Sequence, residues 1–114
     1  MLAFDGFLRM KGFLVKGSSP PTVEIDSCAS SAYIRFQKSG KIARTVSEEK
    51  PGAVVAVDLD AAGNVVGVEL VGVREFSVAV LMSKAQIQAP KVDLSRTRYI
   101  PVRQSVLQEA SQLT

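Results

Sequence analysis

Two runs of β-branched residues flank a Gly-Asn turn in the middle of the chain, and this pattern most constrains the fold. Every second residue from Val55 to Leu59, and again from Val66 to Leu70, is a valine or a leucine. Alternation with a period of two places successive side chains on opposite faces of a strand. Gly63 and Asn64 tolerate the left-handed geometry that a four- or five-residue hairpin loop requires. We therefore predict a β-hairpin that must pack one face against other elements.

Shorter alternating segments precede the hairpin. Residues 22–26 and 32–37 place apolar side chains on one face, and residues 42–46 could form a further strand. The segment 47–52 is charged and ends in Pro-Gly, which predicts a turn.

Residues 75–87 fit either a helix or a strand. Phe76, Val80 and Ile87 recur at helical spacing, whereas the alternation from Phe76 to Met82 suits a strand. We favour the helix, because a sheet with one apolar face must be covered. The predicted fold class is α+β, with an antiparallel sheet of four or five strands and one main covering helix.

The length of 114 residues suits one domain. A Gly-Ser-Ser-Pro-Pro run ends at position 21, so we assign residues 1–21 to an N-terminal arm and linker. Residues 22–114 then form a single α+β domain, with its core at 22–88 and a C-terminal extension at 89–114. The arm could pack on a partner subunit or stay disordered.

Composition excludes several classes of site. The chain has no histidine, so it has no Ser-His-Asp triad and no imidazole metal ligand. Cys28 is the one cysteine, which we expect to be a buried structural thiol. A lone cysteine and the absence of a long apolar run favour a cytoplasmic protein without membrane contact. We predict no cofactor, no metal site and no enzymatic activity.

The order of motifs along residues 22–71 is itself informative. The motifs are a strand ending in Asp26, Ala-Tyr-Ile-Arg-Phe at 32–36, Ala-Arg-Thr at 43–45, Pro-Gly at 51–52, Val-Asp-Leu-Asp at 57–60 and Gly-Asn-Val-Val-Gly-Val-Glu-Leu at 63–70. This order resembles the prokaryotic domain-of-unknown-function family DUF2283. The resemblance implies a small β-rich domain with a covering helix and transfers no catalytic residue. It also suggests a partner-binding role, since members are suspected of accompanying toxin-like genes.

One face of the predicted sheet is too apolar to be freely solvated. It carries Tyr33, Val54, Ala56 and Val65 among polar residues such as Arg35. Faces of this kind usually mark an oligomer or partner interface, although the terminal segments could cover it instead. We predict a non-enzymatic interaction module, homo-oligomeric or an antitoxin-like protein binder. Tyr33 would be its aromatic anchor and Arg35 a polar contact.

Two alternatives use other residues. Basic side chains gather around an aromatic ring near the C-terminus, where they could neutralise phosphates and stack a base: Lys91, Arg96, Arg98, Tyr99 and Arg103. Nucleic-acid binding is therefore the alternative function, and a solvated sheet edge explains the same residues. Asp58 and Glu69 share a face and could form an acid–base or cation pair in a minimal enzyme. We instead expect them to be solvated charges, with Arg35 as a possible cross-strand partner.

Overall fold

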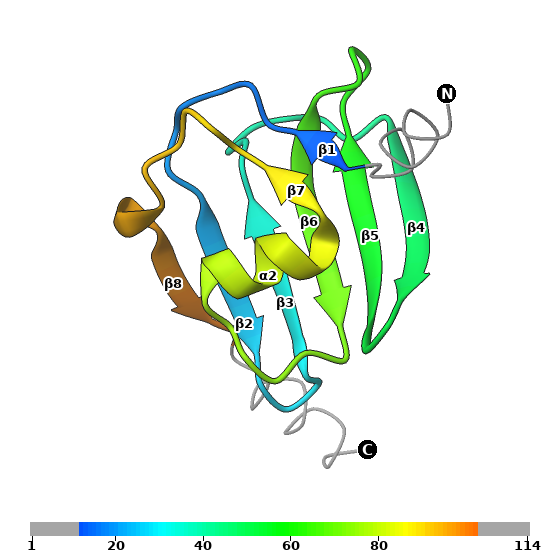
Figure 1. Cartoon of the computed structure of the whole chain (residues 1–114). Coiled ribbons are helices and arrows are strands. Elements are labelled where there is room, and N and C mark those ends of the chain that lie inside the picture. Colours follow the sequence, from blue (N-terminus) through cyan, green and yellow to red (C-terminus); the bar gives the residue numbers. More distant parts are fainter. Residues whose placement is uncertain (1–11, 103–114) are drawn as a thin grey trace, which may run out of the picture.

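The computed structural model describes residues 12–102 of the chain. Its main sheet has six strands in the order β4-β5-β6-β3-β2-β8 (Figure 1). The strands of this sheet are β2 (Thr22–Asp26), β3 (Ser31–Arg35), β4 (Arg44–Lys50), β5 (Ala53–Leu59), β6 (Val65–Val71) and β8 (Arg98–Pro101). The other elements are β1 (Phe13–Leu14), helix α2 (Val78–Ala85), β7 (Ile87–Gln88) and the short 3-10 helix η1 (Leu94–Arg96).

The main sheet is mixed. Its neighbouring strands are antiparallel except for β2 and β8, which run parallel. The α+β class is thus confirmed, whereas a purely antiparallel sheet of four or five strands was only roughly right. The sixth strand, β8, comes from the segment predicted to be a C-terminal extension. β4 is also longer than predicted, because Pro51 and Gly52, the latter with φ of 83°, suffice to reverse the chain.

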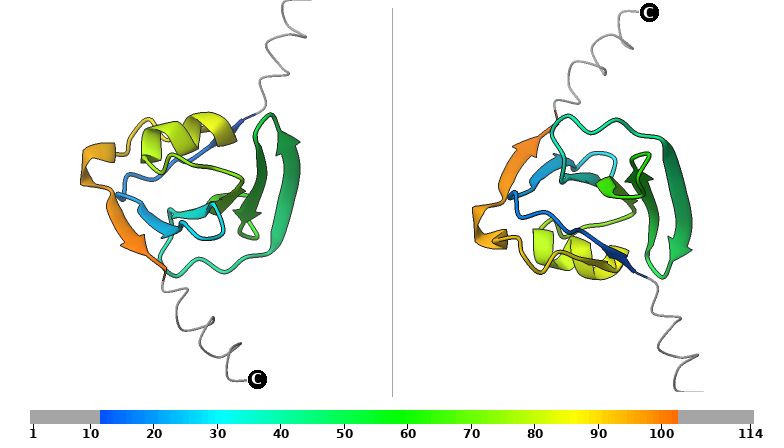
Figure 2. Two further views of the ribbon diagram at one scale, coloured as in Figure 1. Left: turned by 90° about the horizontal axis from the view of Figure 1, so that it is seen from below. Right: turned by 90° about the horizontal axis from the view of Figure 1, so that it is seen from above.

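One face of the main sheet is covered by α2 and by the two-stranded parallel pair β1–β7 (Figures 1 and 2). The core lies between these layers. Val55, Val57 and Leu59 are at most 3% exposed, which confirms the predicted inner face of β5. We call the opposite side of the main sheet the open face. The connection from β3 to β4 runs along that side (Figure 2).

Helix α2 occupies the middle of the segment predicted to be helical, so the helix is confirmed. Ser77 caps its start by accepting the Val80 N–H at 3.4 Å, and Gln86 ends it in a left-handed conformation. The side chains that it buries are Val78, Leu81, Met82 and Ala85. The predicted stripe was wrong, because Phe76 precedes the helix and Ile87 belongs to β7. Within residues 12–102, no helix is long and apolar enough to cross a membrane.

The segment between Phe13 and Pro21, predicted to belong to an arm and linker, packs against the domain. Phe13 and Leu14 pair with Ile87 and Gln88, and Val15 is only 7% exposed. Pro21 is among the fully buried residues. The packed core therefore starts before residue 22.

A β-bulge in the central hairpin changes which side chains face the core. Leu59 pairs with Val65 but Asp58 pairs with Gly67, so Val66 is an extra residue on β6. The extra residue breaks the two-residue alternation, and Val65 turns to the inner face, where it is 3% exposed. The prediction that Val65 lies on the mixed face was therefore wrong.

The turn between β2 and β3 holds the one cysteine. Asp26 Oδ1 accepts the Ala29 N–H at 3.1 Å, and Ser30 has φ of 52°, so the chain reverses tightly. Cys28 lies in this turn and is exposed. The expected buried thiol was wrong, because the turn projects beyond the layers that could bury it.

Candidate functional site

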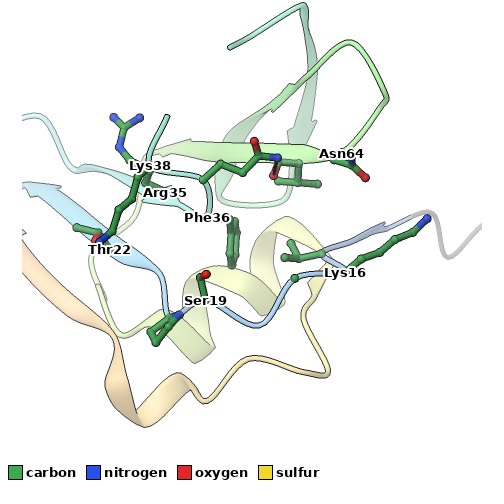
Figure 3. A pocket seen from close by; sticks show the side chains of 12 residues that line it. Lys16, Ser19, Thr22, Arg35, Phe36, Lys38 and Asn64 are labelled. Atoms are coloured by element: carbon green, nitrogen blue, oxygen red, sulfur yellow. Dashed lines mark hydrogen bonds between the residues drawn. The ribbon is translucent and has the colours of Figure 1, made fainter. Parts of the chain in front are cut away.

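A cavity of about 660 Å³ lies at the end of the sheet where β2 begins, β3 ends and β6 begins (Figure 3). Of the predicted interface residues, only Arg35 and Val65 line it. The remaining predicted interface residues lie on the strands of the main sheet, away from this cavity. The open face is therefore the place to test the interface prediction.

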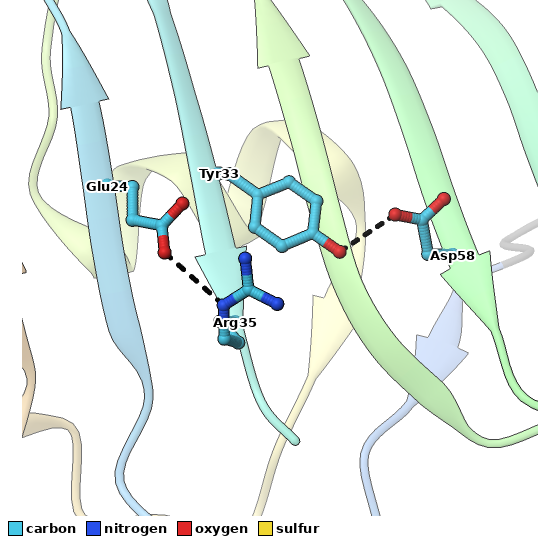
Figure 4. A network of polar contacts seen from close by, with 4 residues as sticks. All are labelled: Glu24, Tyr33, Arg35 and Asp58. Atoms are coloured by element: carbon cyan, nitrogen blue, oxygen red, sulfur yellow. Dashed lines mark hydrogen bonds and ion pairs between the residues drawn. The ribbon is translucent and has the colours of Figure 1, made fainter. Parts of the chain in front are cut away.

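Five polar side chains form a continuous line across the open face, which we call the polar belt: Glu24, Tyr33, Arg35, Thr45 and Asp58. Figure 4 shows all of them except Thr45. Tyr33 Oη donates to Asp58 Oδ2 at 2.7 Å, and Thr45 Oγ1 donates to Asp58 Oδ1 at 2.6 Å. Arg35 Nε donates to Glu24 Oε2 at 3.3 Å. The Arg35 guanidinium carbon also lies 4.9 Å from the centroid of the Tyr33 ring, at cation–π distance. The belt thus links β2, β3, β5 and β4.

Gly67 makes the span from β3 to β5 possible. Tyr33 and Asp58 are separated by β6, and the tyrosine ring crosses that strand to reach the carboxylate (Figure 4). A Cβ placed on Gly67 would lie 2.2 Å from Tyr33 Oη and 2.4 Å from two ring carbons. Any side chain at position 67 would therefore displace the ring. Packing an aromatic ring over a strand glycine also compensates for the missing side chain.

The Tyr33 phenol is held in its neutral form. Partial burial raises its pKa well above the usual value near 10, and the hydrogen bond that it donates to Asp58 adds to the shift. A phenol with this environment is a hydrogen-bond donor throughout the physiological range. Tyr33 is thus a fixed donor and apolar platform, and it is poorly suited to act as a base.

The structure brings most predicted interface residues onto the open face. Tyr33 and Arg35 touch each other within the polar belt, and Ala56 lies beside Asp58 along the same face. Val54 is 44% exposed and pairs across the strands with Val71, which is 43% exposed. Val65 is the exception, because the bulge at Val66 turns it to the inner face. The exposed Val54–Val71 pair lies on the same face as the polar belt.

Asp58 and Glu69 share the open face, as predicted. Asp58 pairs with Gly67 and Glu69 with Ala56, and both oxygens of Asp58 accept hydrogen bonds from the polar belt. Arg35 pairs with Glu24, so it is not the cross-strand partner of either. Within the described residues, no group of three or more His, Cys, Asp or Glu side chains could hold a metal ion.

The open face is rich in acid. The strand registers place five carboxylates on it: Glu24, Asp26, Glu49, Asp58 and Glu69. They place two guanidinium groups on it, those of Arg35 and Arg98. The strands of the open face therefore carry three more carboxylates than guanidinium groups, whereas the whole chain has a net charge of +3; the β3–β4 connection on the same side adds Lys38 and Lys41.

The basic C-terminal residues lie at the β8 edge of the sheet, where Arg98 alone shares the open face by strand register. Lys91, Arg96 and Arg98 are exposed around η1 and β8, whereas Arg103 lies outside the described residues. Tyr99 is 48% exposed, but its hydroxyl accepts the Val78 N–H at 2.9 Å. Tyr99 therefore ties β8 to the first turn of α2 while leaving part of its ring in solvent.

Sequence reasoning missed three members of this site. No sequence pattern marks Thr45 and Glu24 as contact residues, because their roles depend on which strands lie side by side. The sequence does mark Gly67, since a glycine inside a strand pattern indicates a bulge or the close approach of another group to the backbone. Tyr33 supplies the close approach, and only the order β3-β6-β5 reveals it.

The comparisons with known proteins agree with the motif order noted at the outset. Residues 22–74 match the family model described as a protein of unknown function (DUF2283). The matched segment runs from β2 to just beyond β6 and contains the whole polar belt. No curated protein and no solved structure matches the chain significantly.

Proposed function

We propose that this protein, with its DUF2283 segment, is a non-enzymatic interaction module that binds a basic protein partner on the open face. The observation that carries the proposal is the acid-rich, partly apolar open face, which lies opposite the helix-covered one. An antitoxin-like role, in which the partner is held inactive, is the form of this function that we favour.

Charge complementarity identifies the kind of partner. Carboxylates outnumber guanidinium groups on the strands of the open face, and Arg35 is already paired with Glu24. A second copy docked face to face would bring like charges together, which costs several kcal/mol when they are juxtaposed. A basic surface would pair with the same carboxylates and associate faster through electrostatic steering.

Apolar contact would come from the Tyr33 ring and from a valine pair where β5 begins and β6 ends. The Val54–Val71 pair and the Tyr33 ring offer side chains that are already ordered by the sheet. An ordered aromatic side chain loses little conformational entropy on binding, which is why tyrosine is frequent among energetically dominant interface residues. Tyr33→Ala should therefore weaken binding while leaving the secondary structure intact.

The test is native mass spectrometry of the full-length protein purified gently from its own host. We expect a stoichiometric complex with a second, basic polypeptide. Two charge-reversal variants then distinguish the faces: Glu69→Lys alters the open face, and Glu75→Lys alters the exposed loop before α2. Glu69→Lys should weaken binding of the purified partner by about tenfold or more, whereas Glu75→Lys should not.

Other outcomes overturn the proposal. A bare monomer from the host, or a partner bound equally by both variants, removes the open face as its site. Nucleic acid released by salt would favour the alternative function instead, and Arg96→Ala with Arg98→Ala should then abolish a salt-sensitive shift of single-stranded RNA or DNA.

Self-assembly is the second candidate, and one observation favours it. β4 pairs with one neighbour within residues 12–102, so its other edge is available to an added strand. Antiparallel addition centred on Val46 would place Arg44 of each copy opposite Glu48 of the other. We expect Glu48→Arg to disrupt such a dimer and Arg44→Glu with Glu48→Arg to restore it. An unchanged mass in sedimentation for all three proteins would exclude this interface.

A further inference from the structure

The cavity at the end of the sheet adjoins the edge of the open face, and Arg35 belongs to both. It is lined by the connection between β1 and β2, by the end of β3 and by the start of β6. Its volume of about 660 Å³ is within the range of about 300–1,000 Å³ found for small-molecule sites. A small ligand bound in this cavity would require no protein partner on the open face.

The floor of the cavity is apolar. Phe36 projects from the end of β3 toward the segment that carries Ser19 (Figure 3). Val15 and Phe36 are each 7% exposed, and Val65 is 3% exposed. The bulge at Val66 is what turns Val65 toward this region. An apolar body of modest size would therefore meet fixed, well-packed side chains.

The rim of the cavity is cationic. Lys16 lies at one side, with its side chain extended outward, and Arg35 and Lys38 lie at the other (Figure 3). Of the residues in 12–102 that line the cavity, none is acidic. Arg35 is paired with Glu24, but no ion pair within the described chain involves Lys16 or Lys38.

Neutral donors complete the lining. The hydroxyls of Ser19 and Thr22 and the amide of Asn64 border the same space. The Gln37 side-chain amide already makes two hydrogen bonds, because it donates to Asp60 Oδ2 at 3.3 Å and to the Val65 carbonyl at 3.1 Å. Two flexible lysines at the rim of an apolar floor, neither with an ion pair among residues 12–102, are the complement of a molecule with an anionic head and an apolar body.

We propose that this cavity binds a small amphipathic organic anion. Its carboxylate, phosphate or sulfonate head would lie between Lys16 and Lys38, and its apolar body would lie on Phe36 and Val65. Lysine suits this role because its ammonium group can follow the head as a flexible point charge. Both features are required together, so neither a bare inorganic anion nor a neutral apolar molecule should bind comparably.

Three probes separate these requirements. The aryl sulfonate 1-anilinonaphthalene-8-sulfonate carries head and body, inorganic phosphate carries the head alone, and N-phenyl-1-naphthylamine carries the body alone. Binding to the full-length protein is measured by fluorescence for the two dyes and by amide chemical shifts for all three. We expect the sulfonate to bind at least about tenfold more tightly than either other probe, with shifts at residues 15–22 and at Asn64.

The variants assign the binding to the rim. Lys16→Gln with Lys38→Gln should weaken binding of the aryl sulfonate by about tenfold or more, because both uncompensated charges are lost. Lys84→Gln alters an exposed lysine in the last turn of α2 and is the control for charge alone. Undiminished binding by the double variant, equal loss in the control, or shifts confined to the exposed Val54–Val71 pair would each overturn the proposal.

Discussion

Substitution of Gly67 by alanine tests whether Tyr33 depends on the space above β6. The added Cβ would lie 2.2 Å from Tyr33 Oη, so the ring must move and its hydrogen bond to Asp58 is lost. A hydrogen bond to a charged group contributes about 1.5–3 kcal/mol, and the Arg35–Tyr33 contact adds about 0.5–1 kcal/mol. Replacing a strand glycine by alanine by itself stabilises the folded state by about 0.5–1 kcal/mol. We therefore expect Gly67→Ala to lower the free energy of unfolding by about 1–3.5 kcal/mol.

The same substitution should have the opposite sign when the ring is absent. In a Tyr33→Ala background, Gly67→Ala has nothing to displace and should stabilise the protein by about 0.5–1 kcal/mol. Urea unfolding followed by far-UV circular dichroism measures all four proteins of this double-mutant cycle. An equal cost of Gly67→Ala in both backgrounds would falsify the role assigned to the ring.

Three further predictions concern the described contacts. The folded state raises the pKa of Tyr33, so the unfolded chain loses that proton first and the free energy of unfolding should fall as pH rises above about 10. Urea unfolding at a series of pH values should show a smaller decrease for Tyr33→Phe. Hydrogen bonds, chiefly that from the Asn64 backbone N–H, lower the pKa of Asp60, so the stability contributed by its carboxylate is lost as pH falls below about 4. Asp60→Asn should make the melting temperature depend less on pH in this acidic range. Tyr99→Phe removes the acceptor of the Val78 N–H and should cost about 0.5–1.5 kcal/mol, whereas an unchanged urea midpoint would show that water replaces the hydroxyl.

Local patterns were sufficient where neighbouring residues decide the outcome. The alternation of Val55, Val57 and Leu59 predicted the inner face of β5, and the Gly-Asn loop predicted its hairpin. The helix was also predictable, although its buried stripe was not, since the positions of Ser77 and Gln86 set where the helix begins and ends. Val65 was misplaced because one extra residue on β6 reverses the alternation.

The polar belt could be predicted only in part. Tyr33 and Arg35 were recognised as candidate contacts because they alternate with buried residues on one strand. Their partners Asp58 and Glu24 lie on other strands, and the order of strands in the sheet brings them within hydrogen-bond distance. That order cannot be read from the separation of the residues in the sequence. The cavity rim is similar, since Lys16 was assigned to the N-terminal arm, whereas it lines the cavity together with the end of β3.

The sequence alone determined the α+β class, the central hairpin, the covering helix and the absence of histidine chemistry, because each depends on composition or on short-range periodicity. Tertiary structure decided the six-strand order, the bulge that buries Val65 and the passage of Tyr33 over Gly67. These features depend on contacts between residues distant in the chain, whose geometry is set by packing. A strand pattern specifies which side chains share a face, and only the assembled sheet specifies which of them meet.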